Sequence, residues 1–379
     1  MKIVIAPDSY KESLTAMEVA QAIENGFKQV LPNAEYIKLP MADGGEGTVQ
    51  SLIDATGGDL VSVSVTDPLG QSVEGFYGLL GDGSTAIIEM AAASGIHLVS
   101  AEQRNPLLTT SYGTGELIKA ALDKGVKHII VGIGGSATND GGLGMAQALG
   151  VQLLDSEGAN LGYGGGELSK LASINVDHID PRLKEIKLEV ACDVDNPLCG
   201  DKGASAVFGP QKGATPAMVA TLDANLSHYA DIIQATNGRD VKHTPGAGAA
   251  GGLGAAFLGL FNAELRPGIQ IVMDAVQLSD IVNDANLVIT GEGRIDSQTI
   301  HGKTPIGVAR TAKAYNIPVI AIAGSTAKDC HVVYDHGIDA VYSVVLGATD
   351  LATALEEAAF NVEMTSRNVA AALAMALPR

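Results

Sequence analysis

The segment "LVITGEGRIDSQTIHGKTPIGVARTAKAYNIPVIAIA", residues 287–323, contains two apolar runs separated by a longer mixed stretch. Leu287–Thr290 predicts a buried strand, Thr304–Tyr315 predicts a helix, and Pro318–Ala323 predicts a second strand. A strand, a helix and a strand in this order are typical of a parallel sheet whose faces are covered by helices.

The beginning of the chain has the same rhythm. Lys2–Ala6 predicts a strand, and a helix is predicted to start at Ser13 and run to about residue 30, because a capping residue is followed by apolar residues at helical spacing. A strand near Glu35–Leu39 and a helix over Thr48–Thr56 follow. This order again favours a parallel α/β sheet.

The end of the chain continues the pattern with a predicted strand over residues 340–344 and a closing helix over 351–377. Because both ends of the chain share this rhythm, we predict one discontinuous domain made of residues 1–59 and 286–379. Residues 60–285 then form an inserted domain.

The inserted segment begins with a different pattern. Residues 60–80, "LVSVSVTDPLGQSVEGFYGLL", alternate apolar and polar residues on both sides of a Pro-Leu-Gly turn, which predicts an antiparallel hairpin. Helix and strand units return from about residue 113, with strands at His128–Ile133 and Leu188–Ala191 and a helix over 216–235. The inserted domain is therefore predicted to have a sheet of its own.

The composition restricts the class of protein. A chain of 379 residues is long enough for two domains, and 46% hydrophobic residues with only 4% aromatic residues favour an α/β core of Ala, Val, Ile and Leu. The net charge of −19 argues against nucleic acid or an anionic membrane surface as a partner. Three cysteines without a C-x-x-C pair indicate neither a disulfide framework nor a zinc site. With no apolar run typical of a signal peptide or membrane helix, we expect a soluble cytoplasmic protein.

Polar residues and glycines follow most of the predicted strands, where ligands bind in open α/β sheets. They are Asp8, Ser9 and Lys11; Asp43 and Glu46; Gly134, Gly135, Ser136, Thr138, Asn139 and Asp140; Asp193, Asp195 and Asn196; Glu292, Arg294, Asp296, Gln298 and Lys303; and Gly324 and Ser325. Turns and helix caps explain glycine, aspartate and serine at such places, but they do not require Lys11, Arg294 or Lys303. Glycine loops, cations and carboxylates together are the parts of a phosphoryl-transfer site.

Two short matches to nucleotide-binding motifs are incomplete. Gly302-Lys303-Thr304 resembles the end of a P-loop, but Ser297 occupies the position of the first P-loop glycine. Gly246–Gly251 fits G-x-G-x-x-G and raises the alternative of an NAD-dependent oxidoreductase, although no clear strand precedes it. A non-catalytic sensor of carbohydrate acids is a further alternative, but the chain has no basic segment for DNA binding.

Asp193 and Asp195 are the candidate metal ligands. Residues two apart on an extended strand end point to the same side, so the two carboxylates could share a cation such as Mg²⁺. The alternative is a solvated aspartate turn.

Seven segments together resemble the bacterial type I glycerate kinases. They are "APDSYKESL" (6–14), "MADGGEGT" (41–48), "GIGGSATNDGG" (132–142), "ACDVDNPL" (191–198), "GPQKGA" (209–214), "GAGAAGGLG" (246–254) and "TGEGRIDSQTIHGKTP" (290–305). The resemblance covers essentially the whole chain in the same order. It implies two α/β domains, one flavodoxin-like and discontinuous and the other inserted with a mixed sheet.

The resemblance also implies an activity. Members of this family transfer the γ-phosphoryl group of ATP, with Mg²⁺, to D-glycerate, in the breakdown of glyoxylate, glucarate or galactarate. The product is expected to be 2-phosphoglycerate, with a 3-kinase that yields 3-phosphoglycerate as the alternative. The oligomeric state, a homodimer included, stays open.

We assign roles to the candidate residues from their chemistry. Lys11, Asp193 and Arg294 are predicted to be catalytic, with Asp193 as the base and Asp195, alone or with Asp193, on the metal. The predicted substrate-binding residues are Asp8, Ser9, Asp43, Glu46, Asp296 and Gln298. The predicted nucleotide-binding residues are Gly134, Gly135, Ser136, Thr138, Asn139 and Lys303.

Overall fold

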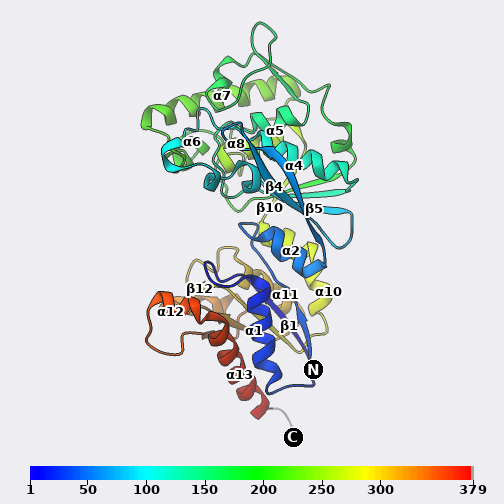
Figure 1. The fold of residues 1–379 in the computed structure, drawn as a ribbon, viewed down its shortest axis with the longest axis vertical. Coiled ribbons are helices and arrows are strands. Elements are labelled where there is room, and N and C mark those ends of the chain that lie inside the picture. The colour runs from blue at the N-terminus through cyan, green and yellow to red at the C-terminus, as the bar shows by residue number, and fades with distance from the viewer. Residues whose placement is uncertain (377–379) are drawn as a thin grey trace. The chain divides into compact units, whose positions relative to one another are not determined.

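The computed structural model describes residues 1–376, which fold into two compact units (Figure 1). Unit 1 comprises Met1–Asp43, Gln50–Gly57 and Ile269–Arg379, and unit 2 comprises Gly44–Val49 and Gly58–Gly268. The domain boundaries expected from the sequence stay a prediction. They differ from the compact units mainly at residues 269–285, which belong to unit 1.

Unit 1 contains a five-stranded parallel sheet. Its strands are β1 (Lys2–Pro7), β2 (Glu35–Lys38), β11 (Leu287–Gly291), β13 (Val319–Ala323) and β15 (Ala340–Ser343). They are arranged in the order β15-β13-β11-β1-β2. Counted along the chain within unit 1, this is the flavodoxin-like order 2-1-3-4-5, whose switch point lies between β1 and β11. The predicted flavodoxin-like parallel sheet is confirmed.

Helices cover the sheet of unit 1. They are α1 (Ala16–Lys28), α2 (Thr48–Thr56, whose first two residues belong to unit 2), α9 (Gly268–Ala275, with Gly268 in unit 2), α10 (Leu278–Val282), α11 (Thr304–Lys313), α12 (Leu351–Glu356) and α13 (Ala358–Ala376). Helices α1 and α13 lie side by side (Figure 1), so close that a Cβ at Gly26 would be 2.3 Å from the Glu363 carbonyl oxygen. Their apolar residues pack with Ile3, Ile5 and Ile289 in one core.

Two helix boundaries differ from the prediction. Helix α1 begins at Ala16 rather than at Ser13, because Thr15 and Glu18 form a capping box. The Ser13 hydroxyl instead donates to the Leu355 carbonyl at 2.8 Å. The closing helix is divided into α12 and α13 at Glu357, and its predicted last residue, Leu377, lies outside the described residues.

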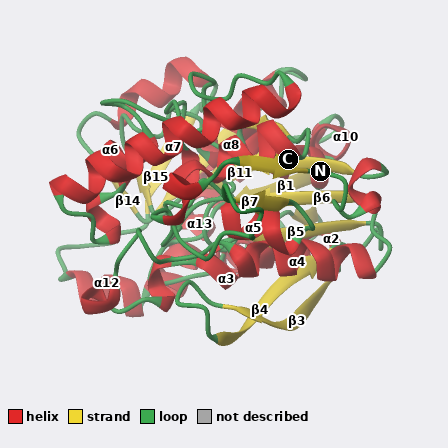
Figure 2. Cartoon of the chain, turned by 90° about the horizontal axis from the view of Figure 1, so that it is seen from above, coloured by secondary structure: helices red, strands yellow, loops and turns green. Residues whose placement is uncertain are grey.

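Unit 2 contains a six-stranded mixed sheet in the order β10-β9-β6-β5-β4-β3. Its strands are β3 (Asp59–Thr66), β4 (Ser72–Leu79), β5 (Thr85–Glu89), β6 (His128–Gly132), β9 (Lys187–Ala191) and β10 (Glu264–Arg266). Strands β3 and β4 form the predicted antiparallel hairpin (Figure 2), and β5, β6, β9 and β10 run parallel. The predicted mixed sheet is confirmed.

The helices of unit 2 are α3 (Ala91–Ser94), α4 (Tyr112–Asp123), α5 (Leu143–Ala148), α6 (Ala204–Phe208), α7 (Pro216–Asn237) and α8 (Ala249–Leu260). Short strand pairs join β7 (Gln152–Leu154) to β8 (Ser173–Asn175) in unit 2, and β12 (Arg294–Ile295) to β14 (Ser325–Thr326) in unit 1. In residues 1–376, no helix is both long and apolar enough to cross a membrane.

Candidate functional site

The two strands at the switch point of unit 1 end side by side. The Asp8 amide donates to the Gly291 carbonyl at 2.8 Å, so the segment after β1 stays in line with the end of β11. A Cβ at Gly291 would lie 1.8 Å from the Ile322 carbonyl oxygen, so only glycine allows β11 and β13 to approach this closely. Residues that follow β1 and β11 are thereby brought together at the sheet edge where ligands bind in this topology.

Asp8 is the first predicted site residue at this edge. Its carboxylate accepts a hydrogen bond from the Thr304 hydroxyl at 2.6 Å and one from the Ser9 amide at 2.7 Å. Burial raises the pKa of Asp8 to about 6, and the negative charges of Asp43 and Glu292 act in the same direction. Asp8 therefore changes charge near neutral pH, where a carboxylate can exchange a proton with a substrate.

Glu292 directly follows β11 and is almost completely buried. It accepts a hydrogen bond from the Thr299 hydroxyl at 2.6 Å and pairs with Lys303 Nζ at 3.2 Å. Burial raises the pKa of Glu292, whereas Thr299 and Lys303 lower it. Lys303, predicted to bind nucleotide phosphates, thus has one carboxylate partner already and stands immediately before helix α11.

The remaining predicted residues of unit 1 are more exposed. Arg294, with 67% of its side chain accessible, pairs with Asp296 at 3.3 Å. The Asp296 carboxylate also accepts a hydrogen bond from the backbone N–H of Gln298 at 2.9 Å, and this bond holds the loop in a turn. Lys11 is exposed, and its backbone packs beside Gly293. Two cations therefore stand on the surface near the buried carboxylates, where they can meet an anionic substrate.

The predicted glycine-rich loop of unit 2 follows β6. Gly134 and Gly135 form its exposed tip, and Gly135 has a φ of 72°, which favours glycine. Ser136 is 7% exposed, and Thr138 and Asn139 are completely buried. The Asn139 amide donates to the Ser205 hydroxyl at 3.0 Å. Thr138 and Asn139 therefore belong to the base of the loop, whereas Gly134 and Gly135 can offer backbone N–H groups to an anion.

Two ionisable residues for which the sequence predicted no role, Lys212 and Asp140, lie beneath this loop. Lys212 is 1% exposed and donates to the Ser136 hydroxyl and the Thr138 carbonyl, both at 2.6 Å. Asp140 is completely buried and accepts hydrogen bonds from the Ser111 amide and hydroxyl at 2.9 and 2.8 Å. Burial lowers the pKa of Lys212 to about 7 and raises that of Asp140. Lys212 stands in the motif "GPQKGA", whose glycines and proline give it the look of a surface turn.

Glu46 lies in the short segment of unit 2 that crosses the ends of its parallel strands. The Val49 amide donates to Glu89, at the end of β5, at 2.9 Å, and a Cβ at Gly132 would be 2.9 Å from the Gly44 carbonyl oxygen. Glu46 itself is exposed, and its charge helps to raise the pKa of Glu89. This segment thus places Glu46 at the same sheet edge as the loop after β6.

Asp193 and Asp195 follow β9 at that edge and are both exposed. The Asp193 carboxylate accepts the Gly268 amide at 3.0 Å. Within the described part of the chain, no group of three or more His, Cys, Asp or Glu side chains could hold a metal ion. One or two carboxylates nevertheless suit Mg²⁺ that arrives with nucleotide phosphates, because this ion keeps several waters and takes few protein ligands.

The G-x-G-x-x-G match of Gly246–Gly251 has a packing role. A Cβ at Gly248 would lie 2.1 Å from the Pro197 carbonyl oxygen, and one at Gly251 would lie 2.0 Å from the Thr138 carbonyl oxygen. Gly246 and Gly251 also have positive φ angles. These glycines let the segment pack against two other loops of unit 2, which explains the pattern without a dinucleotide.

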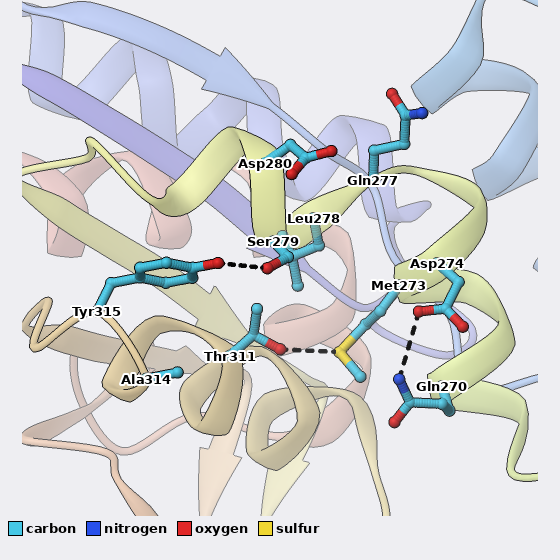
Figure 3. Close-up of a pocket in the computed structure, with 10 residues that line it drawn as sticks. All are labelled: Gln270, Met273, Asp274, Gln277, Leu278, Ser279, Asp280, Thr311, Ala314 and Tyr315. Carbon is cyan, nitrogen blue, oxygen red and sulfur yellow. Dashed lines mark hydrogen bonds between the residues drawn. The ribbon is translucent and has the colours of Figure 1, made fainter.

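A pocket of about 480 Å³ in unit 1 contains none of the predicted residues. Figure 3 shows it between α9, α10 and the second half of α11, with Ser279 bonded to Tyr315 at 2.7 Å and Thr311 to Met273 at 3.4 Å. Since α11 begins at the strand ends with Thr304, Thr311 near its end and Tyr315 just after it lie away from that edge. The pocket is therefore separate from the candidate site.

Glycine-rich, cationic and acidic strand ends are the parts that a phosphotransferase uses, and the comparisons with known proteins identify that class. The model of the glycerate kinase family matches residues 3–374. A glycerate kinase of Haemophilus influenzae (strain ATCC 51907 / DSM 11121 / KW20 / Rd) is 63% identical, covering 99% of both chains. Glycerate 2-kinase of Escherichia coli (strain K12) is 59% identical, covering 100% of this chain and 99% of its own.

A solved structure agrees with these relatives. The crystal structure of a Salmonella typhimurium LT2 protein, provisionally called glycerate kinase 2, has a TM-score of 0.92 and 58% identity, covering 99% of both chains. The chain belongs to the glycerate kinase family, and it is an enzyme. The oxidoreductase and sensor alternatives are therefore wrong.

Proposed function

We propose that this enzyme transfers the γ-phosphoryl group of ATP to the 2-hydroxyl group of D-glycerate and releases 2-phosphoglycerate. The observation that carries the proposal is the 59% identity, over the whole chain, to the Escherichia coli protein named glycerate 2-kinase. The Salmonella typhimurium structure, with its provisional name, supports glycerate as the acceptor. We place the reaction in the cytoplasm, where ATP is available.

In unit 1, the exposed cations suit the carboxylate of glycerate. Lys11 and Arg294 stand near the buried carboxylates Asp8 and Glu292, and Arg294 offers a planar fork that matches a carboxylate. Asp296 holds Arg294 at 3.3 Å in the present arrangement, so a substrate carboxylate would share or replace this partner. Ser9, Asp43 and Gln298 complete the set proposed to bind glycerate in this unit.

Two carboxylates compete for the role of general base. Asp193 is the base predicted from the sequence, and it is exposed with a hydrogen bond from Gly268. Asp8 has a pKa of about 6, close to the pH at which a base works best, and lies at the switch point of its sheet. The pH dependence of Asp8→Asn and Asp193→Asn variants distinguishes the two assignments.

The nucleotide phosphates are proposed to meet backbone N–H groups of Gly134 and Gly135, which are exposed at the loop tip. Within unit 1, Lys303 stands at the start of α11, and we propose that it binds a phosphoryl group there. Asp193 and Asp195 would hold Mg²⁺, which neutralises charge that develops on the transferred group. The chain's own residues thus bind the anions, orient the hydroxyl group and accept its proton.

The test incubates the purified protein with ATP, Mg²⁺ and D-glycerate and follows the product through enolase, pyruvate kinase and lactate dehydrogenase without phosphoglycerate mutase. A direct enolase signal is the expected result, because enolase consumes 2-phosphoglycerate. A signal that needs added mutase would indicate a 3-kinase. No ADP release would overturn glycerate as the acceptor.

A further inference from the structure

Lys212 is a buried cation without a carboxylate partner. Lysine is almost never fully buried unless it is paired, yet Lys212 is 1% exposed and, among residues 1–376, forms no salt bridge. Its two hydrogen bonds go to uncharged oxygens, the Ser136 hydroxyl and the Thr138 carbonyl. Burying an unpaired ammonium costs far more than burying a neutral amine.

The number of hydrogen bonds fits the neutral amine. An ammonium has three N–H donors, whereas a neutral amine has two, and two donated bonds are present. A proton added to Lys212 therefore brings a third donor and a full charge into a loop with no carboxylate bound to it. An incoming anion would compensate both.

The loop of residues 134–139 also contains buried polar atoms that have no hydrogen-bond partner in the described part of the chain. Among the described residues, Thr138 Oγ1 and Asn139 Oδ1 are buried without a hydrogen-bond partner. Such atoms are rare in folded proteins and call for an explanation. Above them, Gly134 and Gly135 are exposed and able to present N–H groups. The loop of residues 134–139 thus combines these unpaired polar atoms with an exposed glycine tip, and a buried lysine from another segment donates to it.

We infer that Lys212 is a positioning residue that supports the loop of residues 134–139 and takes up a proton when nucleotide polyphosphate binds to that loop. This inference rests on the proposed nucleotide-binding function of the loop. Lys212 acts on the phosphates through Ser136 and Thr138 and by its charge.

The titratable surroundings agree with this. Burial lowers the pKa of Lys212 to about 7, although the negative charge of Asp140 raises it. Asp140 is itself held by Ser111 and faces Tyr229, whose pKa burial raises well above its ordinary value. Arg104 donates to the carbonyl of Gln211, the residue before Lys212, at 3.4 Å.

The sign of the pH dependence follows from linkage. A bound anion raises the pKa of Lys212, so the complex binds more protons than the free protein, and affinity is highest below the free pKa of about 7. If phosphate raises the pKa by about two units, affinity falls about 25-fold between pH 7 and pH 9. At pH 8, binding is then accompanied by uptake of about 0.8 proton.

The experiment titrates the full-length protein with MgADP by calorimetry between pH 7 and 9, in buffers that differ in ionisation enthalpy. This range lies above the phosphate pKa of about 6, so the ligand contributes little. The titration of the wild-type protein gives the proton uptake with which the variants are compared. K212M keeps a long unbranched side chain without charge, K212R is always charged, and K124M removes an exposed lysine of unit 2 as the matched control.

The expected result is uptake of about 0.8 proton at pH 8 in wild type and K124M, and none attributable to this site in K212M and K212R. Wild type that binds MgADP without proton uptake, or K212M with unchanged uptake and pH dependence, would overturn the inference. If nucleotide binds with uptake but glycerate is not phosphorylated, the proposed function fails and the inference stands. If the protein phosphorylates glycerate but takes up no proton on binding MgADP, the proposed function stands and the inference about Lys212 fails.

Discussion

Replacing Asp8 by asparagine should separate activity from stability. The carboxylate of Asp8 is buried at the end of β1 near the charges of Asp43 and Glu292, so its ionised form is unfavourable in the folded protein. Asparagine has nearly the same shape; its oxygen can accept the Ser9 backbone N–H, and its NH₂ group can donate to the Thr304 hydroxyl. The variant should therefore fold well but lose the group proposed to receive the hydroxyl proton.

The magnitude follows from the pKa of Asp8. Its rise from 3.8 to about 6 means that the ionised carboxylate costs the folded state about 3 kcal/mol above pH 6. Because the folded pKa is the higher one, this cost is absent below about pH 4, grows as pH rises to 6 and stays constant above. D8N should accordingly be more stable than wild type by up to about 3 kcal/mol at pH 8 and similar to it at pH 4.

Thermal or denaturant unfolding at the two pH values measures this difference, and the coupled kinase assay measures activity. If the ionised carboxylate is required, wild-type kcat/KM at pH 5 should be about a tenth of its plateau, and D8N should lose at least about 100-fold at all pH values. A D8N protein that is less stable than wild type at pH 8, or that keeps most of its activity, would refute this reasoning.

Two other substitutions, each with a matched control, test the substrate-binding role of Lys11 and the close packing of β11 against β13. Lys11→Ala removes an exposed cation proposed to bind the substrate carboxylate, so kcat/KM should fall about 100-fold or more while the unfolding midpoint stays unchanged. Lys28→Ala, the control at another exposed lysine, should leave activity intact. Wild-type kinetics in K11A would exclude this role. Gly291→Ala places a Cβ 1.8 Å from the Ile322 carbonyl oxygen and should lower the free energy of unfolding of unit 1 by about 2 kcal/mol or more. Gly347→Ala, the control with open space around the new Cβ, should change the free energy of unfolding by no more than about 0.5 kcal/mol. Equal unfolding midpoints of the two glycine variants would contradict the close approach of β11 and β13.

Local pattern was enough to predict much of the fold. The alternation of residues 60–80 depends only on neighbouring residues and on a turn, and the hairpin β3–β4 is confirmed. The buried strands β1, β11 and β13 are predicted for the same reason, since each is a short apolar run of neighbouring residues. The flavodoxin-like order came from the family resemblance, because β1 pairs with β11 across more than 280 residues and no local pattern encodes that pairing.

The structure of the candidate site was less predictable. Position after a strand sufficed to select Asp8 and Gly134, because strand ends meet at one edge of a parallel sheet. It could not reveal that Thr304 bonds Asp8, or that Lys212 is buried beneath Ser136, since both contacts join distant parts of the chain. Between glycine and proline residues, Lys212 has the local pattern of a surface turn.

The coupled assay without phosphoglycerate mutase tests the central claim most directly. With ATP, Mg²⁺ and D-glycerate, the account predicts ADP release and an enolase-dependent signal of equal rate, which means that the 2-hydroxyl group is phosphorylated. ADP release whose enolase signal appears only after the mutase is added would contradict the proposed position. Absence of any glycerate-dependent ADP release would contradict the proposed substrate.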